Sequence, residues 1–432
     1  MKLYLCVSVL LISLFCFSPQ AEIQAQSNVI TEPAVVIGSV TSDGVVFHRF
    51  ISGNFNQIAT LPSDFSLDAD SNPAWFIPDT GLFSASPNGR FVAFPAVDDA
   101  NNYALFIFDL VDSNLEQISV PFFMYPSWAP DSAGIRLDPS FLHEYALDRG
   151  VIDPQRYFYD LTTSQIVQIT QTLSDIPGFA SWLPDSSGYF YAWGDLTLVD
   201  RDGTNKRRLG PDLANFTSTR VCSAIWLPNN ARYYFRIDCS FAHSLGSIDT
   251  NGNFSVVFDA EEISPYIHIN DIVLIDEYQG DPVIATYTSI GGFPEHHWYL
   301  SRVTDQGLDT LVTHTSEESS THLYEASISP DETYVAMTGL SGEPQIIIRL
   351  FNIASGEEVA VIDPSPDYIC DSRWLDDTKL VYEQTQENCY AFYDAAIGNL
   401  YVYDLVTGIN PLVTLDPGWI LPTTQTPIAV ND

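Results

Sequence analysis

Residues 182–192 read Trp182-Leu-Pro-Asp-Ser-Ser-Gly-Tyr-Phe-Tyr-Ala192, and variants of this phrase recur along the chain. Each copy has an aromatic or small apolar residue, any residue, Pro-Asp or Pro-Asn, and then an apolar run rich in strand-forming residues. Successive third positions are 43 to 54 residues apart, apart from one interval of 102 residues that is close to two periods. Such a period predicts a repeat architecture. The copies begin at Ala85, Trp128, Trp182, Trp226, Ile328 and, with Asp in place of Pro, Trp374.

Two further strands follow each phrase and are joined by a tight polar turn. Leu196–Asp200 leads into Arg201-Asp-Gly203, and Leu400–Asp404 leads into a turn that ends at Gly408. Gly supplies the positive φ that such turns need, and Asp or Asn tolerates it. No helical periodicity is sustained for long. Four short strands in each period of about 40 to 50 residues are typical of a β-propeller blade.

The phrase resembles the Trp-Ser-Pro-Asp-Gly motif of TolB-like, or WD-type, propeller repeats. The resemblance covers roughly residues 30–415 and implies the blade architecture, but no particular activity. The chain departs from the motif in two respects. Glycine follows the Pro-Asp or Pro-Asn pair only at Gly89, and the unit between Ile269 and Leu311 has lost the phrase.

The fold class expected is therefore all-β, a propeller of four-stranded antiparallel blades. Seven meanders start near residues 82, 126, 180, 222, 270, 325 and 370. Residues 33–62 align with the last three strands of a further blade, whose first strand we expect from the C-terminal residues 418–430. Eight blades in a single domain, 30–430, are favoured, because strands from both termini would then leave no exposed edge. Seven blades, with the N-terminal hairpin as an extra layer, is the alternative.

Residues 1–25 have the pattern of a secretory signal peptide. Lys2 precedes an apolar stretch from Leu3 to Phe17, and the small residues Ala21 and Ala25 follow. This stretch is short for a membrane span, and no later segment is apolar enough to insert into a membrane. We expect the mature protein to be secreted, periplasmic or at the cell surface.

The cysteines fit such a location, because disulfides form in oxidising compartments. Cys222 and Cys370 each lie six residues before the third position of their phrase, so they occupy equivalent places in two blades. Their nearest downstream cysteines are Cys239 and Cys389. Repeat equivalence favours the pairs 222–239 and 370–389 among the three possible connectivities. Four free thiols are the alternative.

The chain is strongly acidic, with 55 Asp and Glu against 17 Lys and Arg and a net charge of −38. Such a charge disfavours nucleic acid and other polyanions as partners. The negative charge either keeps the protein in solution or attracts cations or a basic partner.

In a propeller, the connections after the second and fourth strands of each blade share one face. The long connections expected there are 62–81, 137–156, 259–267, 288–297, 313–324 and 384–398. Long connections on one end of a rigid scaffold commonly carry binding residues. Candidates for this partner face are His143, His268, Glu295, His296, His297, Trp298, His314 and His322. No metal or other cofactor is predicted, since these histidines match no established metal motif; a divalent cation is the alternative.

The function expected is that of an exported, non-catalytic binding or scaffold propeller that engages a protein or peptide. No Gly-x-Ser-x-Gly nucleophile motif occurs. The repeated phrase itself is interpreted as a turn that holds blades together and binds no ligand. An enzyme at the mouth of the channel, of the glycosidase or lyase kind, is one alternative, although no pair of carboxylates stands out. A structural surface-layer component is another.

Overall fold

The chain divides into Met1–Glu32 and Pro33–Asp432, and every described residue belongs to the second unit. Within the described residues, regular structure is β-strand, and no helix is long and apolar enough to cross a membrane. The computed structural model describes residues 35–41, 44–51, 53–67, 73–77, 82–139, 156–169, 179–183, 185–193, 195–209, 221–227, 231–237, 244–259, 267–290, 296–304, 307–316, 323–341, 343–386, 398–408, 411, 413 and 418–421.

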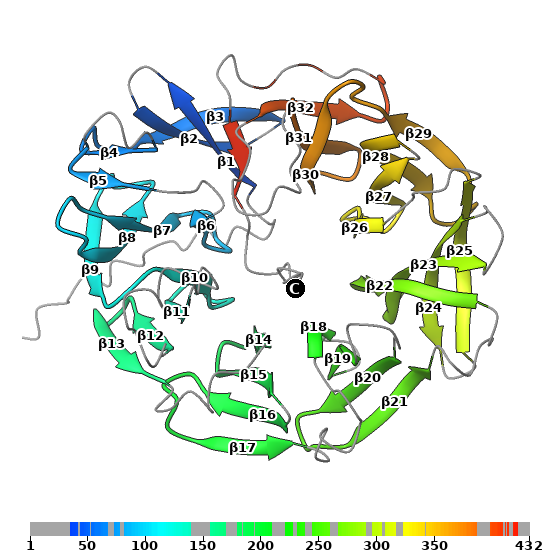
Figure 1. The fold of residues 1–432 in the computed structure, drawn as a ribbon, viewed down its shortest axis with the longest axis horizontal. Coiled ribbons are helices and arrows are strands. Elements are labelled where there is room, and N and C mark those ends of the chain that lie inside the picture. The colour runs from blue at the N-terminus through cyan, green and yellow to red at the C-terminus, as the bar shows by residue number, and fades with distance from the viewer. Residues whose placement is uncertain are drawn as a thin grey trace, which may run out of the picture. The chain divides into compact units, whose positions relative to one another are not determined.

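The described strands form eight sheets, called blades 1 to 8, which are arranged in a ring (Figure 1). Each blade runs from an innermost strand near the axis of the ring to an outermost strand at its rim. This confirms the all-β propeller with eight blades. Blade 1 contains β33 (Gly418–Ile420), β1 (Val36–Thr41), β2 (Gly44–Ile51) and β3 (Asn54–Thr60). Blade 2 contains β4 (Phe65–Ser66), β5 (Trp75–Phe76), β6 (Ser84–Ala85), β7 (Phe91–Val97), β8 (Tyr103–Asp109) and β9 (Leu115–Val120).

Blades 3 to 5 are regular four-stranded meanders. Blade 3 contains β10 (Met124–Trp128), β11 (Gly134–Pro139), β12 (Tyr157–Asp160) and β13 (Gln165–Gln168). Blade 4 contains β14 (Phe179–Trp182), β15 (Gly188–Trp193), β16 (Asp195–Asp200) and β17 (Lys206–Leu209). Blade 5 contains β18 (Val221–Leu227), β19 (Arg232–Ile237), β20 (Ser244–Asp249) and β21 (Phe254–Asp259).

Blades 6 to 8 complete the ring. In blade 8, Val413 N–H donates to Leu400 O at 2.7 Å and so extends the hydrogen-bonded ladder beyond the third strand. Blade 6 contains β22 (Ile267–Tyr278), β23 (Asp281–Ile290), β24 (His296–Thr304) and β25 (Gly307–Ser316). Blade 7 contains β26 (Leu323–Ile328), β27 (Tyr334–Ser341), β28 (Glu343–Asn352) and β29 (Glu358–Ile362). Blade 8 contains β30 (Tyr368–Trp374), β31 (Lys379–Thr385) and β32 (Asn399–Asp404).

Strands from both ends of the unit close the ring in blade 1. The C-terminal strand β33 pairs antiparallel with β1, with Ile37 opposite Ile420 and Ser39 opposite Gly418. A Cβ atom at Gly38 would overlap the Trp419 ring, so this close approach requires glycine. The expectation that the first strand of this blade comes from the C-terminal residues is confirmed.

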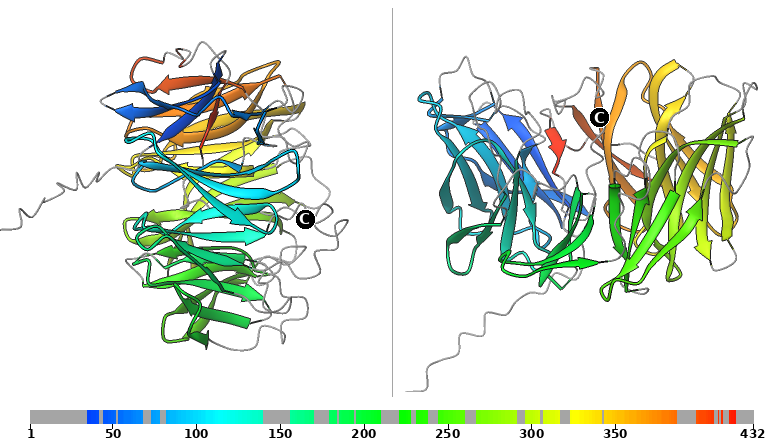
Figure 2. Two further views of the ribbon diagram at one scale, coloured as in Figure 1. Left: turned by 90° about the vertical axis from the view of Figure 1, so that its left-hand side faces the viewer. Right: turned by 60° about the horizontal axis from the view of Figure 1, so that its bottom comes forward.

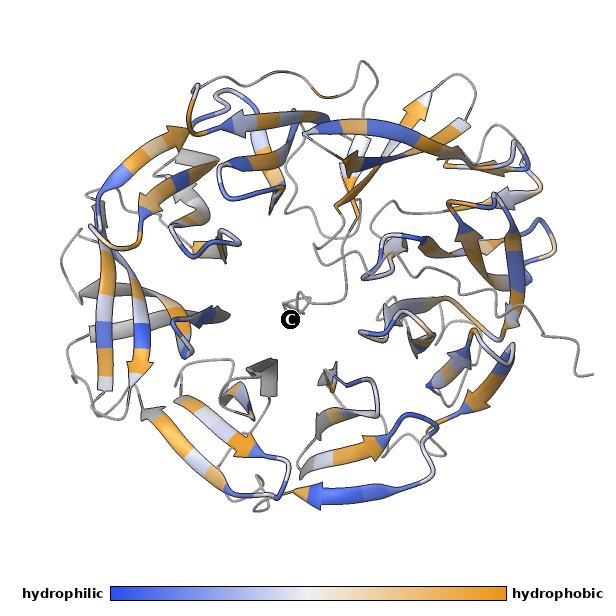
Figure 3. Cartoon of the chain, turned by 180° about the vertical axis from the view of Figure 1, so that it is seen from behind, coloured by the Kyte–Doolittle hydropathy of each residue, from blue (hydrophilic) through white to orange (hydrophobic). Residues whose placement is uncertain are grey.

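The strands run between two faces of the ring, as the side view shows (Figure 2). We call one end the turn face, because it carries the turns between first and second and between third and fourth strands. The other end, the loop face, is where the strands that flank 140–155, 260–266, 317–322 and 387–397 end. Apolar and polar residues alternate along the strands (Figure 3), and the apolar side chains pack between neighbouring blades.

The phrase tryptophans link neighbouring blades by hydrogen bonds. Each donates its indole N–H to a backbone carbonyl in the innermost strand of the preceding blade, and each acceptor lies one residue before that blade's own phrase. The bonds are Trp128 Nε1 to Ser84 O, 3.0 Å, Trp182 Nε1 to Ser127 O, 3.1 Å, and Trp374 Nε1 to Ser327 O, 3.1 Å.

A second series of bonds joins the turns that follow the innermost strands. The backbone N–H of one turn donates to a side-chain oxygen of the next turn. Each accepting residue has a φ near 60°, and Gly89 has the same φ in the turn of blade 2. Together with the tryptophan bonds we call this series the turn ring. Its members are Asn88 N to Ser132 Oγ, 3.1 Å, Asp131 N to Ser186 Oγ, 2.9 Å, and Gln279 N to Glu332 Oε2, 3.0 Å.

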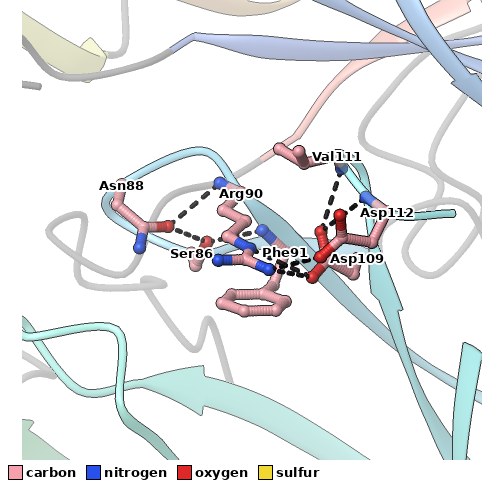
Figure 4. Close-up of polar contacts among 7 residues, drawn as sticks. All are labelled: Ser86, Asn88, Arg90, Phe91, Asp109, Val111 and Asp112. Carbon is pink, nitrogen blue, oxygen red and sulfur yellow. Dashed lines mark hydrogen bonds and ion pairs between the residues drawn. The ribbon is translucent and has the colours of Figure 1, made fainter. Parts of the chain in front are cut away.

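The turn of blade 2 shows how polar atoms are used locally (Figure 4). Asn88 Oδ1 accepts from Ser86 Oγ at 2.7 Å and from Arg90 N–H at 2.9 Å. The Arg90 guanidinium binds Asp109 at 2.6 Å and Asp112 at 2.7 Å. The polar side chains of this turn therefore hold the fold together.

Candidate functional site: an acid–arginine cluster beside the ring closure

Several of the predicted partner-face residues fall outside the described residues. They are His143, Glu295 and His322, and the same holds for Cys239 and Cys389. Cys222 lies in β18, where only its backbone is described. Cys370 lies in β30 and takes part in a disulfide bond, but its partner is not among the described side chains. The pairs 222–239 and 370–389 therefore stay predictions.

Blade 6 differs from the expectation in its strand lengths. Residues 288–297 and 313–324 were expected as long connections, but β23 continues to Ile290, β24 begins at His296, and β25 continues to Ser316. β-Branched and aromatic residues such as those of Thr286–Ile290 favour this extension. His268, His296, His297, Trp298 and His314 consequently lie in strands.

The blade 6 residues with described side chains take part in packing and local hydrogen bonds. Trp298 is 1% exposed in the core between blades 6 and 7. His314 lies against Trp298 and Phe351, and burial is the main cause that lowers its pKa. His297 Nδ1 lies 2.9 Å from Thr315 Oγ1.

The backbones of His268 and His296 both lie opposite Ser289 in the ladder. Within the part of the chain that the structure describes, no three or more His, Cys, Asp or Glu side chains are grouped to hold a metal ion.

Charged side chains gather instead on the inner strands of blades 7 and 8. We call Glu325 of β26, Asp371 and Arg373 of β30, and Glu383 of β31 the acid–arginine cluster. Arg373 NH1 lies 3.3 Å from Glu325 Oε1, and Arg373 NH2 lies 3.8 Å from Asp371 Oδ1. One guanidinium thus lies between carboxyl groups of two neighbouring blades.

Glu383 ties this cluster to the closing strand. Its side chain is buried, with 4% exposed, and it accepts hydrogen bonds from the backbone N–H groups of Ile420 and Gly398. Its Oε1 atom is buried and has no hydrogen-bond partner. The cluster therefore reaches from the innermost strand of blade 7 to β33, the strand that closes the ring.

The cluster contains more acid than base, and its carboxyl groups have raised pKa values. Burial raises the pKa of Glu325 to about 7, even though Arg373 opposes the shift. Burial also raises the pKa of Asp371. The pKa of Glu383 is raised well above its usual range, first by burial and then by the charge of Asp371. A group with a pKa near neutral, such as Glu325, can exchange protons at physiological pH, and groups with strongly shifted pKa values concentrate at functional sites.

The sequence analysis did not identify these residues. One signal was available for Glu325, Asp371 and Arg373, since each is a charged residue within an innermost strand, whereas the innermost strands β10, β14 and β18 contain no charged residue. Glu383 could not be found in this way, because it lies in a second strand, and no local pattern shows that Glu325 and Arg373 of different blades meet.

No family model matches the chain, and no curated protein matches it in sequence. Solved structures share the fold. A dihydro-heme d1 dehydrogenase, NirN, matches with a TM-score of 0.57 at 13% identity, over 89% of this chain and 74% of that chain. Dipeptidyl peptidase 4 of Porphyromonas gingivalis matches with a TM-score of 0.51 at 12% identity, over 78% of this chain and 53% of that chain. An oligogalacturonate lyase matches with a TM-score of 0.46 at 13% identity, over 74% and 83%.

This chain spans about half of the length of several matched peptidase chains. At such identities the likeness shows the β-propeller fold alone.

Proposed function

We propose that this protein is an exported, non-catalytic binding propeller that engages a basic protein or peptide through its loop face. The observation that carries the proposal is the difference between the two faces. On the turn face, polar atoms of successive turns bind one another, as in the bond from Asp131 N–H to Ser186 Oγ. On the loop face, the strands lead into the long connections, and connections at one end of a rigid scaffold commonly carry binding residues.

The charge of the chain indicates the chemistry of the partner. With a net charge of −38, the protein repels polyanions and attracts basic surfaces, and this attraction raises association rates. TolB-like repeats, which the phrase resembles, supply a scaffold for such a role. Export through the N-terminal signal sequence is part of the same proposal.

One observation favours a second candidate, an acid–base enzyme at the axis of the ring. Glu325 has a pKa of about 7, and Asp371 lies at the opposite end of the same guanidinium. Glycosidases use two carboxyl groups on opposite sides of the scissile bond. Here Arg373 occupies the space between the two groups, and this arrangement favours binding over hydrolysis.

Hydrogen–deuterium exchange of the mature protein, residues 26–432, tests the proposal. The probes are a lysine-rich peptide, a glutamate-rich peptide and oligogalacturonate. We expect the lysine-rich peptide alone to bind and to protect amides near the loop face, such as 135–139 and 323–326, while 86–90 and 329–333 exchange as before. Protection confined to the turn face, or turnover of oligogalacturonate that Glu325→Gln abolishes, would contradict it.

Matched charge variants separate the two faces. The loop-face variant carries Glu261→Gln, Glu262→Gln and Glu295→Gln, and the turn-face variant carries Asp202→Asn, Asp249→Asn and Asp404→Asn. Both lose three negative charges. We expect only the loop-face variant to bind the lysine-rich peptide more weakly, by about ten-fold, a change of about 1.4 kcal/mol. Equal effects would show that the attraction is general. Concentration-dependent self-association without peptide binding would favour a surface-layer component.

A further inference from the structure

We propose that the outer edge of β13, the outermost strand of blade 3, pairs with the same strand of a second copy of this chain. The two strands run antiparallel about a two-fold axis, with Ile166 opposite its own counterpart, and the two blades then form one continuous sheet. The inference goes beyond the proposed function, because it concerns the rim of the ring, where β13 lies (Figure 1), and not the loop face.

The strand β13 is exposed along its whole length. It reads Gln165-Ile-Val-Gln168, and Ile166 is 42% exposed and Val167 37% exposed. Because successive side chains of a strand point to opposite faces, β13 presents an apolar side chain on each face of the blade. Neither residue belongs to the apolar cores beside blade 3, so these side chains do not serve the packing between blades.

The backbone of β13 can extend the sheet on its outer side. β13 is the last strand of its sheet, and no other described strand pairs with that side. On the inner side, Ile169 N–H donates to Arg156 O at 2.8 Å. Hydrogen-bonded pairs alternate along an antiparallel ladder, so Val167 also bonds to β12, and the N–H and C=O groups of Ile166 face outward.

Other outermost strands of the ring have features that protect their edges. Charged side chains on an edge strand discourage pairing with another chain, and β9, β17, β21, β25 and β29 each contain at least one charged residue. The strand β3 contains none, but its apolar side chains are partly or fully buried. Among the outermost strands that the structure describes, only β13 combines an uncharged edge with exposed apolar side chains.

The distribution of charge indicates a second copy as the partner of this edge. The sequence has no charged residue from Leu161 to Ser174, so a basic protein or peptide gains no attraction at β13. Two copies of the chain carry a net charge of −38 each and repel one another, and an uncharged edge is where they can approach at the lowest electrostatic cost. A two-fold contact uses the same patch on both copies, so it covers both exposed edges at once.

The symmetry of the contact determines its register. A two-fold axis perpendicular to the sheet keeps each side chain on its own face, so the axis must pass beside a residue that meets its own counterpart. Ile166 is such a residue, because its outward N–H and C=O groups can exchange two hydrogen bonds with those of its counterpart. The two Ile166 side chains then lie against each other on one face, and Gln165 lies opposite the counterpart of Val167 on the other face.

Antiparallel pairing also determines the direction of the loop faces. β13 begins after the turn that follows β12 at the turn face, and it runs toward the loop face. Its counterpart runs in the opposite direction, so the loop faces of the two copies are directed to opposite sides. The dimer can therefore bring two basic partners together, and it does not hold one partner between two loop faces.

Sedimentation velocity of the mature protein over a series of concentrations tests the proposal. We expect a reversible dimer that tightens by about ten-fold as NaCl rises from about 0.05 to 0.5 M, because salt screens the repulsion between the copies. Ile166→Lys should weaken the dimer by at least about ten-fold, since it places two like charges at the axis. Val256→Lys adds the same charge at an outermost-strand residue that is 45% exposed, and it should change dimerisation by less than about two-fold.

A mixture of two variants tests the register. Lysine and glutamate meet at the axis only if Ile166 faces its counterpart, so equal amounts of Ile166→Lys and Ile166→Glu should dimerise about ten-fold more tightly than either variant alone. Circular dichroism shows whether each variant is folded. A mixture that dimerises no better than its components would overturn the pairing.

The unaltered protein provides the other decisive outcomes. A protein that stays monomeric at about 0.1 mM in about 0.5 M NaCl would overturn the inference, as would equal weakening of the dimer by Ile166→Lys and Val256→Lys. Binding of the lysine-rich peptide should weaken with salt and should be the same for Ile166→Lys and Val256→Lys. If the dimer forms as expected and this peptide does not bind, the proposed function fails and this inference stands.

Discussion

The turn face and the acid–arginine cluster both contain carboxyl groups, but the pKa values of these groups shift in opposite directions. A hydrogen bond from Thr204 lowers the pKa of Asp202, and one from Asn253 lowers the pKa of Asp249. Burial raises the pKa of Glu325 and of Glu383. Asp202 and Asp249 receive donors from residues two and four positions away, whereas Glu325 is paired with Arg373 of another blade and Glu383 with the backbone of other strands. An acid whose hydrogen-bond donors lie nearby in the sequence stabilises its own turn. An acid that is buried and only partly paired with groups from other strands is a candidate for function.

The largest expected effect concerns the tryptophans that link the blades. Trp128 is fully buried, and its indole N–H binds Ser84 O. We expect Trp128→Ala to lower the free energy of unfolding by about 3–5 kcal/mol, measured by urea denaturation, since it leaves a large cavity. Trp128→Phe keeps most of the packing and should cost less. A loss below about 1 kcal/mol for Trp128→Ala would show that the phrase does not hold the blades together.

The next effect concerns the disulfide of Cys370, which lies one residue before Asp371 of the cluster. If Cys389 is its partner, removal of the bond by Cys370→Ser frees a loop of about 20 residues and costs about 3 kcal/mol. Non-reducing peptide mapping should recover Cys370 linked to Cys389. A peptide that links Cys370 to Cys222 or Cys239 would show that the repeat equivalence used for the pairing is wrong.

The repeated phrase made the ring predictable from the sequence, because each copy encodes a local turn and the strands beside it. The closing strand was also predictable from the number of strands in each blade. Residues 33–62 supply only three strands, so the first strand had to come from the C-terminal residues. The strand lengths of blade 6 did not follow, because His296 and Ser316 continue a ladder that only the neighbouring strands determine.

The acid–arginine cluster could not be predicted for a related reason. The register of β30 against β31 shifts between Ile369 and Ser372, so strict alternation does not give the direction of Asp371. Arg373 and Glu325 are 48 residues apart and meet only because blades 7 and 8 are neighbours in the ring. No local pattern encodes such a contact.

Stability should depend on pH through the cluster. The pKa of Glu325 rises from 4.5 to about 7 on folding, so the folded state binds more protons than the unfolded state. Its contribution is fully present below pH 4.5 and is lost as the pH rises through 7. One pKa unit is worth about 1.4 kcal/mol, so the protonated Glu325 side chain contributes up to about 3 kcal/mol. Urea denaturation between pH 5 and 8 should show this loss, and Glu325→Gln should flatten the profile.

Turn acids such as Asp202 have the opposite sign, because their lowered pKa values add stability that is lost only as the pH falls below about 4. Asp202→Asn is therefore the control for the pH profile and should leave the slope between pH 5 and 8 unchanged. If the free energy of unfolding of the unaltered protein did not change between pH 5 and 8, the contrast between the cluster acids and the turn acids would be wrong.

The smallest expected effect comes from single bonds of the turn ring. Ser132 Oγ and Ser186 Oγ each accept one backbone N–H from the preceding blade. Replacement by alanine leaves a partly buried N–H without its partner, and each variant should lose about 0.5–1.5 kcal/mol in urea denaturation. Because both serines lie at the turn face, the affinity for the lysine-rich peptide should stay unchanged in these variants. A serine variant that weakened binding of this peptide as much as the loop-face variant does would mean that the two faces are energetically coupled. The bonds between turns would then contribute to binding as well as to stability.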